Sequence, residues 1–276
     1  MIGRRLFTAA LVAATALALG FLLLPLVAIF LRVPPGDLIS QLGSDVVLDA
    51  IRVTLKATLI SQALILLIGT PAAYLIASRA FRGRALAITL VELPLVLPPA
   101  VAGIALLAAF GRLGLLGGTF EALGISISFT AAAVVLAVTY VASPFYVRQA
   151  IASFEALDQS LLDASRTLGA SPARTFLRIA IPLASPGLAA GAALAFARGL
   201  GEFGATIMFA GSLQGVTQTV SLAIYAQFDL NFDVALALGG LLILVSALVL
   251  FLVKLIPGWT RSTSTSLSPF ARFGSS

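Results

Sequence analysis

One polar segment, residues 148–181, interrupts a chain whose other long stretches are too apolar to lie in water. Its charged side chains are three of the chain's eleven acidic residues and four basic ones: Glu155, Asp158, Asp163, Arg148, Arg166, Arg174 and Arg178. Apolar runs long enough to cross a bilayer lie on both sides of this segment. The segment must therefore stand outside a membrane and face something soluble.

The composition predicts an all-α polytopic membrane protein. Hydrophobic residues make up 60% of the 276 positions and charged residues only 10%, far from the balance of a soluble domain. The chain has neither Cys nor His, so it lacks thiol nucleophiles, disulfides, the usual zinc ligands and the commonest general base. The sequence therefore argues against an enzyme and against a metal site.

Six apolar spans are predicted, at about residues 6–31, 51–77, 85–110, 129–147, 182–210 and 234–256. A cleaved signal peptide competes for the first, because Ala16-Leu17-Ala18 resembles a cleavage site. However, the apolar run continues past the usual signal core of about 7 to 15 residues. The connection at 211–233 is apolar enough for a re-entrant or interfacial helix.

The positions of arginine and lysine predict the topology. With the amino terminus inside, the twelve inner residues are Arg4, Arg5, Arg79, Arg82, Arg84, Arg148, Arg166, Arg174, Arg178, Lys254, Arg261 and Arg272. The four outer ones are Arg32, Arg52, Lys56 and Arg112. Basic residues favour the cytoplasmic side, so both termini are predicted to be cytoplasmic. Because the cations behind the net charge of +6 lie between apolar spans, they do not indicate a nucleic-acid partner.

The third and fifth spans are predicted to lie in the protein interior. Pro94, Pro98 and Pro99 would break the hydrogen-bond ladder of the third span, and free backbone groups at membrane depth need protein or a wet cavity beside them. A kinked helix facing lipid is the alternative. The fifth span is rich in small residues, which let helix backbones approach closely: Gly187, Gly191, Gly199, Gly201 and Gly204.

Within the polar segment, two short helices are predicted. The apolar spacing indicates a helix over Phe154–Leu168, and Gly169 is typical of the position after a helix C-terminus. Ser171 can cap a second, amphipathic helix that has Pro172 at its first position.

The pattern Asp163-Ala164-Ser165, then Gly169, then Ile179 and Ile181-Pro182 resembles the E-A-A…G…I-x-L-P loop of ABC importer permeases. The departures, Asp for Glu, Ser for the second Ala and Ile for Leu, are chemically mild. The resemblance implies that residues 148–181 form a cytoplasmic loop whose coupling helix inserts into a cleft of an ATPase; an ordinary cytoplasmic helical hairpin is the alternative. The residues assigned to this contact are Asp163, Ala164, Ser165, Gly169, Ser171, Pro172, Ile179 and Pro182.

Further stretches are similar to the molybdate and sulfate branch of these permeases. They are residues 53–57, 93–103, 201–206, 210–212 and 217–219. The resemblance implies a type I ABC importer permease fold with six transmembrane helices in the inner membrane. The expected cargo is molybdate or tungstate, with sulfate or thiosulfate as the alternative within the same branch.

The same resemblance implies the domains and the partners. A transmembrane permease domain is expected at 1–256, with its core at 50–256, and a polar cytoplasmic tail at 257–276. The expected partners are a second identical permease, a cytoplasmic ATPase dimer, an extracytoplasmic oxyanion-binding protein and membrane lipid.

The energy source is predicted to be another chain. A P-loop needs a Gly-x-x-x-x-Gly-Lys-Ser/Thr frame, and neither Lys56 nor Lys254, the only lysines, lies in one. ATP and Mg²⁺ are therefore expected on the partner ATPase, and no cofactor is expected on this chain. A secondary anion transporter or channel is the alternative of a different class, but it should show an internal repeat, and none is convincing.

Three charges fall inside predicted spans: Glu92, Arg198 and Glu202. Arg198 and Glu202 are four residues apart, close enough to pair on one helix face. In one interpretation the pair, with or without Glu92, neutralises charge and braces helices. In the other, Arg198 becomes available to a passing dianion. The residues assigned to a translocation pathway are Glu92, Pro94, Pro98, Pro99, Arg198, Glu202 and Thr206.

Overall fold

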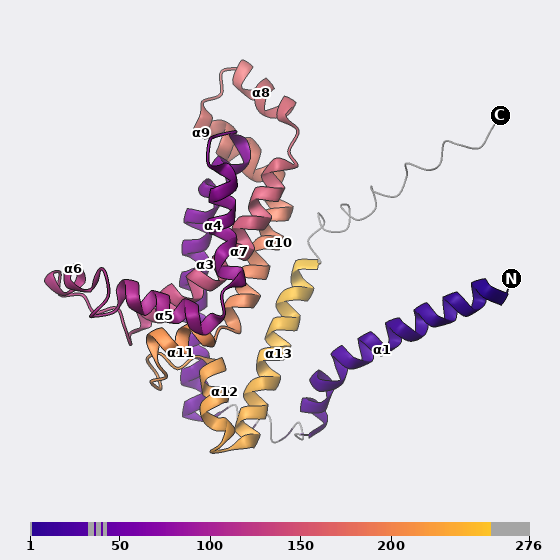
Figure 1. Cartoon of the computed structure of the whole chain (residues 1–276), viewed down its shortest axis with the longest axis vertical. Coiled ribbons are helices and arrows are strands. Elements are labelled where there is room, and N and C mark those ends of the chain that lie inside the picture. Colours follow the sequence, from indigo (N-terminus) through magenta and orange to yellow (C-terminus); the bar gives the residue numbers. More distant parts are fainter. Residues whose placement is uncertain (1, 33–35, 37–39, 41–42, 255–276) are drawn as a thin grey trace.

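The computed structural model describes residues 2–32, 36, 40 and 43–254, and all regular structure in this part of the chain is helical (Figure 1). Five helices are long and apolar enough to cross a membrane, and a bent pair of shorter helices makes a sixth span. The spans are α1 (Ile2–Arg32), α3 (Asp45–Ser78), the pair α4 (Arg84–Val96) and α5 (Pro99–Phe110), α7 (Ala131–Glu155), α10 (Ile181–Leu200) and α13 (Phe232–Lys254). The prediction of six spans is confirmed. The predicted tail at 257–276 lies outside the described residues.

Helices α3, α7 and α10 form the central bundle and pack along most of their length (Figure 1). Glycines allow this packing: an added Cβ at Gly191 would lie 2.9 Å from Gln149 Cβ, and one at Gly199 would lie 3.0 Å from Val138 Cγ1. Polar side chains of α3 also bond across the bundle, since the Ser61 hydroxyl donates to the Val135 carbonyl at 2.9 Å. The fifth span is therefore an interior helix, as its small residues predict.

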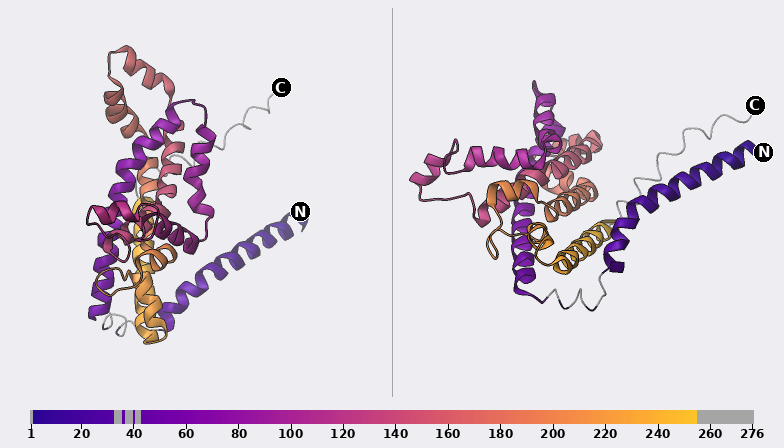
Figure 2. Two further views of the ribbon diagram at one scale, coloured as in Figure 1. Left: turned by 60° about the vertical axis from the view of Figure 1, so that its left-hand side comes forward. Right: turned by 60° about the horizontal axis from the view of Figure 1, so that its bottom comes forward.

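Helix α1 projects away from this bundle, and Figures 1 and 2 show it as a separate rod. Within the described residues it packs against the lower part of α13, where Phe30 lies beside Gly240. Its large apolar side chains are exposed, which in a membrane protein is the arrangement of a helix covered by lipid. Its 31 residues correspond to roughly 46 Å of helix, enough to cross a bilayer.

The fourth span is longer than predicted. Helix α7 continues to Glu155 rather than ending at Val147, so Arg148 lies within the helix of the fourth span. The predicted helix Phe154–Leu168 is therefore wrong at its start, because Phe154 is buried at the end of α7. A separate helix, α8 (Gln159–Thr167), begins after Asp158, whose carboxylate accepts from the Ser160 N–H at 2.9 Å. Hydrogen bonds from the side chain and the backbone of Ser160 hold the pKa of the Asp158 carboxyl below its usual value.

The fifth span begins earlier and ends earlier than predicted. It starts with α9 (Pro172–Thr175), passes through one π-helical turn, η1 (Phe176–Ala180), and continues as α10 to Leu200. Residues 201–203 are not helical, and a short helix, α11 (Gly204–Ala210), follows. At the break, the Glu202 carboxylate accepts from the Ala205 N–H in the first turn of α11 at 2.8 Å.

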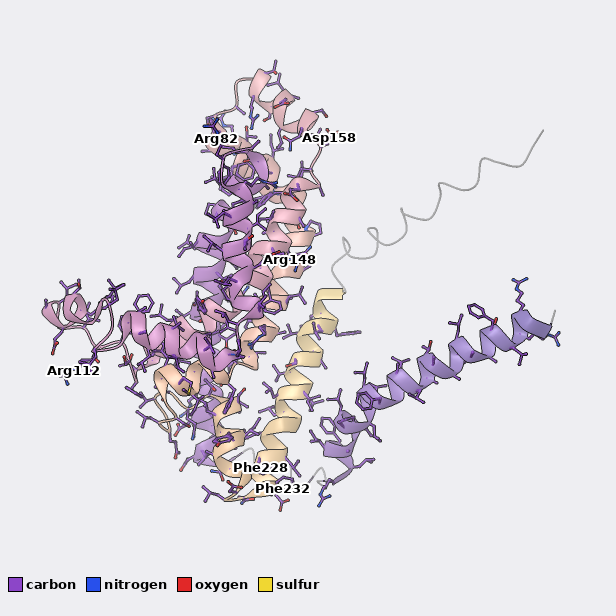
Figure 3. All side chains as sticks on the ribbon, viewed as in Figure 1. Arg82, Arg112, Arg148, Asp158, Phe228 and Phe232 are labelled. Carbon is purple, nitrogen blue, oxygen red and sulfur yellow. The ribbon has the colours of Figure 1, made fainter. Side chains whose placement is uncertain are left out.

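The connections between spans gather at two ends of the bundle. The loop at 79–83 lies with α8 and α9 at one end, and Figure 3 shows Arg82 and Asp158 there. The helix α12 (Val220–Phe228) lies at the other end, where Figure 3 labels Phe228 and Phe232. The helix expected in residues 211–233 is thus confirmed. Helix α6 (Gly117–Ala122) extends sideways beyond α5 (Figure 1).

Candidate functional site

The loop at one end of the bundle has the turn that its sequence predicts. Gly169 has φ +82°, a conformation that strongly favours glycine, and a Cβ added there would meet no atom within 4 Å. The Ser171 hydroxyl accepts from the Arg174 N–H at 3.3 Å, and Pro172 is the first residue of α9. The backbone conformation, rather than crowding, therefore requires glycine between α8 and α9.

A buried polar contact joins α8 to α9. The Ser165 hydroxyl lies 3.0 Å from the Thr175 hydroxyl, and both side chains are buried. Leu162 packs beneath them in the core formed with α7 and α10. The two short helices thus make one unit, which is fixed to the start of the fifth span.

The other face of α8 is open. The Asp163 side chain is 66% exposed and forms an ion pair with Arg166 at 3.0 Å, and Ala164 beside it is exposed too. Leu161 on α8 and Leu168 just after its end are 48% and 88% exposed. These two leucines therefore face outward, whereas Leu162 between them is buried.

Aromatic contacts fix the base of the loop. The ring of Phe176 lies 4.7 Å from that of Tyr74 on α3, and Tyr74 lies 5.2 Å from Phe154 on α7. Ile179 is half-buried in the same cluster, whereas Pro182 is exposed at the start of α10. The base of the loop therefore contacts the second, fourth and fifth spans together.

The third span breaks at the predicted prolines. Helix α4 contains Pro94, Pro98 precedes α5, and Pro99 is its first residue; the two helices are bent by 115°. Helix α5 packs against α11, because Cβ atoms added at Gly204 and Gly103 would lie 2.5 Å from Pro99 Cβ and 2.6 Å from the Ala205 carbonyl oxygen. The structure therefore brings the breaks of the third and fifth spans together.

Arg198 and Glu202 form the predicted ion pair. Arg198 Nη1 lies 2.7 Å from Glu202 Oε2, and the Glu202 side chain is only 1% exposed. Thr206, on α11, is fully buried, and its hydroxyl has no hydrogen-bond partner in the part of the chain that the structure describes. Thus a charge pair and an unbonded hydroxyl both lie beside the break of the fifth span.

Glu92 does not join this pair, contrary to one version of the bracing hypothesis. Its Oε1 lies 3.4 Å from Arg148 Nε on α7. A second ion pair between the same helices joins Arg84 to Glu155. Sequence reasoning missed Arg84, Arg148 and Glu155 because it placed all three in loops. The sequence did contain a signal: Arg84 and Glu92 are eight residues apart on α4, and Arg148 and Glu155 are seven residues apart on α7, so two antiparallel ion pairs can form between these helices.

Residues 65–261, well over half of the chain, match the family described as binding-protein-dependent transport system inner membrane component. The chain belongs to this family. It is therefore a multi-pass membrane component of a transport system, and the resemblance to ABC importer permeases is confirmed.

Two sequence relatives of this permease cover most of it. It is 46% identical over 237 residues to the molybdenum transport system permease protein ModB of Mycobacterium tuberculosis, which spans 83% of this chain and 87% of the relative. It is 37% identical over 208 residues to the sulfate transport system permease protein CysW of Synechococcus elongatus, which spans 74% of this chain and 73% of the relative.

The fold of the permease is that of a solved ABC importer. The chain superposes with a TM-score of 0.70 on a chain of a bacterial alginate ABC transporter in complex with an alginate pentasaccharide-bound periplasmic protein. The match covers 94% of this chain and 95% of the other at 16% identity. The predicted importer permease fold is confirmed.

Proposed function

We propose that this permease is the membrane-spanning subunit of an ATP-driven importer for a tetrahedral oxyanion, molybdate or the closely similar tungstate. The observation that carries the proposal is the 46% identity to a molybdenum transport permease over 83% of the chain. A sulfate permease is less similar, at 37% over 74% of the chain. Sulfate or thiosulfate is therefore the second candidate cargo.

The proposed assembly contains two copies of this chain, two ATPase subunits and an extracytoplasmic binding protein. The open face of α8, with Asp163, Ala164 and Leu168, is the surface we assign to the ATPase. ATP and Mg²⁺ are held by that partner, and this chain holds no cofactor. The distribution of arginine and lysine supports cytoplasmic α8 and cytoplasmic termini, which leaves α12 on the side of the binding protein.

The proposed mechanism depends on the residues that connect α8 to the fifth span. ATP-driven movement of the ATPase pushes α8, and the turn at Gly169, Ser171 and Pro172 keeps α8 at a fixed angle to α9. Ile179 and Pro182 lie where the loop enters the fifth span. That span ends at the break before α11, which packs on α5 at Pro99. A displacement at α8 thus reaches both broken spans. A cavity between them would be lined from Glu92, Pro94, Pro98, Pro99, Arg198, Glu202 and Thr206.

Purification of the permease with its ATPase and binding protein tests this function. The binding protein is titrated with molybdate, tungstate and sulfate, and uptake of each anion is measured in vesicles that contain the complex. We expect ATP-dependent uptake of molybdate and tungstate that stops when the ATPase is inactivated or the binding protein is omitted. Uptake of sulfate alone supports the second candidate. Uptake without ATP or binding protein contradicts both.

A further inference from the structure

A cavity of about 200 Å³ lies between α4 and α7. This volume is several times the roughly 30 Å³ that one water molecule occupies in the liquid. Its apolar wall includes Ile88, Val91 and Ile151, and its charged side chains are Glu92, Arg148 and Glu155. The cavity thus combines one guanidinium with two carboxylates in a mostly apolar surrounding.

The two ion pairs between these helices differ in how tightly they are held. At the helix ends, Arg84 pairs with Glu155 and also donates through Nε to the Ile76 carbonyl at 2.8 Å, so it is tied to α3 and α7 together. Further in, Arg148 meets Glu92 through Nε at 3.4 Å, and the Arg148 side chain is 68% exposed. The inner arginine is therefore the more accessible of the two.

The position of Arg148 along α7 limits what its exposed side can contact. It lies seven residues before the end of α7, roughly 10 Å along the helix, and Figure 3 shows it well away from Arg82 and Asp158. Charged side chains inside a span face protein or water rather than lipid, because a charge in hydrocarbon is expensive. The open side of Arg148 must therefore face a water-filled space or protein.

We propose that this cavity is a binding station for the transported oxyanion at the coupling-loop end of the pathway, with Arg148 as the anion contact and Glu92 as its competitor. The proposal depends on the oxyanion import proposed above. A guanidinium binds tetrahedral oxyanions through two parallel N–H donors, and Arg148 has the exposed surface for it. Apolar walls strengthen the attraction by excluding water.

Glu92 gives the station the weakness that transport needs. Conduction requires sites that an ion can leave. The Glu92 carboxylate, 3.4 Å from Arg148 Nε, repels the bound anion and pairs with Arg148 again after the anion has left. The Arg198–Glu202 pair cannot play this part in the same structure, because Glu202 is buried and must separate from Arg198 first. Arg148 is accessible without such a rearrangement.

The test measures how molybdate on the ATPase side inhibits uptake by the complete complex in vesicles, with sulfate assayed in parallel. An anion that occupies the station from that side blocks the exit. We expect Glu92→Gln to lower the half-inhibitory concentration and Arg148→Gln to raise it, each by roughly tenfold, the change that a charge-assisted contact commonly makes. Arg148→Lys keeps the positive charge but lacks the two parallel N–H donors of a guanidinium. Its half-inhibitory concentration should lie between those of Arg148→Gln and the wild type.

Arg112→Gln is the control, since it removes an exposed arginine–glutamate ion pair, with Glu121, whose members do not line the cavity. It should leave the half-inhibitory concentration within about twofold of the wild type. Equal effects of Glu92→Gln and Arg112→Gln, or no opposite shift between Glu92→Gln and the Arg148 variants, would overturn the station. If the Arg148→Gln complex does not assemble, the half-inhibitory concentrations of Glu92→Gln and Arg148→Lys still test the proposal. A wild-type complex that imports neither anion contradicts the proposed function instead.

Discussion

Ser165 on α8 and Thr175 on α9 share a buried hydroxyl contact of 3.0 Å across the Gly169 turn. Thr175→Val removes one partner at nearly constant volume and leaves the Ser165 hydroxyl without its cross-helix contact. The Ser165 hydroxyl donates to the Leu162 carbonyl at 2.7 Å, so it accepts from Thr175 and keeps one partner in the variant. Loss of one such hydrogen bond costs about 0.5–1.5 kcal/mol. We expect the variant complex to hydrolyse more ATP per imported anion, because α8 is held less firmly to α9. Simultaneous measurement of ATP hydrolysis and uptake checks this.

Ser165→Ala in the Thr175→Val background controls for volume. Once the hydroxyl contact is gone, this further change should add little, so the effects of the two substitutions should not be additive. Additive effects would show that the two hydroxyls act independently.

Gly169→Val should uncouple the permease from its ATPase. A residue other than glycine at φ +82° costs about 1–2 kcal/mol, and the strain is relieved by turning α9 away from α8. The expected result is normal assembly with loss of substrate-stimulated ATP hydrolysis. Gly83→Val is the matched control: it has φ +94° and open space, but lies in the α3–α4 loop. Equal loss in both variants would mean that strain anywhere at this end is enough.

Asp163→Lys should likewise abolish stimulated hydrolysis while the permease stays in the membrane. The side chain is 66% exposed and pairs only with Arg166 among the ion pairs of the described residues, so folding of the chain alone should change little. Reversal of the charge opposes a cationic or amide group of the ATPase. Asp163→Asn keeps the shape and should retain part of the stimulation. Full stimulation in Asp163→Lys would remove this residue from the coupling contact.

Arg198→Ala and Glu202→Gln distinguish the two hypotheses for the inner ion pair. Bracing predicts loss of folded complex in both variants. Arg198→Ala leaves the buried Glu202 carboxylate uncompensated, which costs about 3–5 kcal/mol, and Glu202→Gln removes the partner of the 28% exposed Arg198. Anion contact predicts that Glu202→Gln assembles but imports slowly, since the amide oxygen can still accept from the Ala205 N–H that Glu202 caps. The yield of complex is measured beside uptake. A stable, fully active Arg198→Ala complex contradicts both hypotheses.

Single cysteines test the topology, because the native chain has none. Cysteine at position 82 or 160, both at the coupling-loop end, should resist an impermeant reagent added outside intact cells. Cysteine at position 118 or 229, in exposed segments on the predicted outer side, should react. Labelling of 82 or 160 from outside would reverse the orientation.

Local features of the chain were predictable because they depend on neighbouring residues. The spans follow from apolar length, the bend of the third span from the prolines at 98 and 99, and the turn after α8 from Gly169. The pairing of Arg198 with Glu202 follows from their separation of four residues on one helix. Each of these features appears in the structure where the sequence places it.

From the sequence by itself the class of the protein follows: a membrane subunit with six apolar spans and one polar loop between the fourth and the fifth. Only the tertiary structure decided that Arg148 and Glu155 belong to α7, that Glu92 pairs with Arg148, and that α5 packs on α11 at Pro99. The physical reason is that a charged residue can extend a span when a partner on another helix neutralises it. Such a partner lies far away in the sequence and becomes a neighbour only when the helices pack.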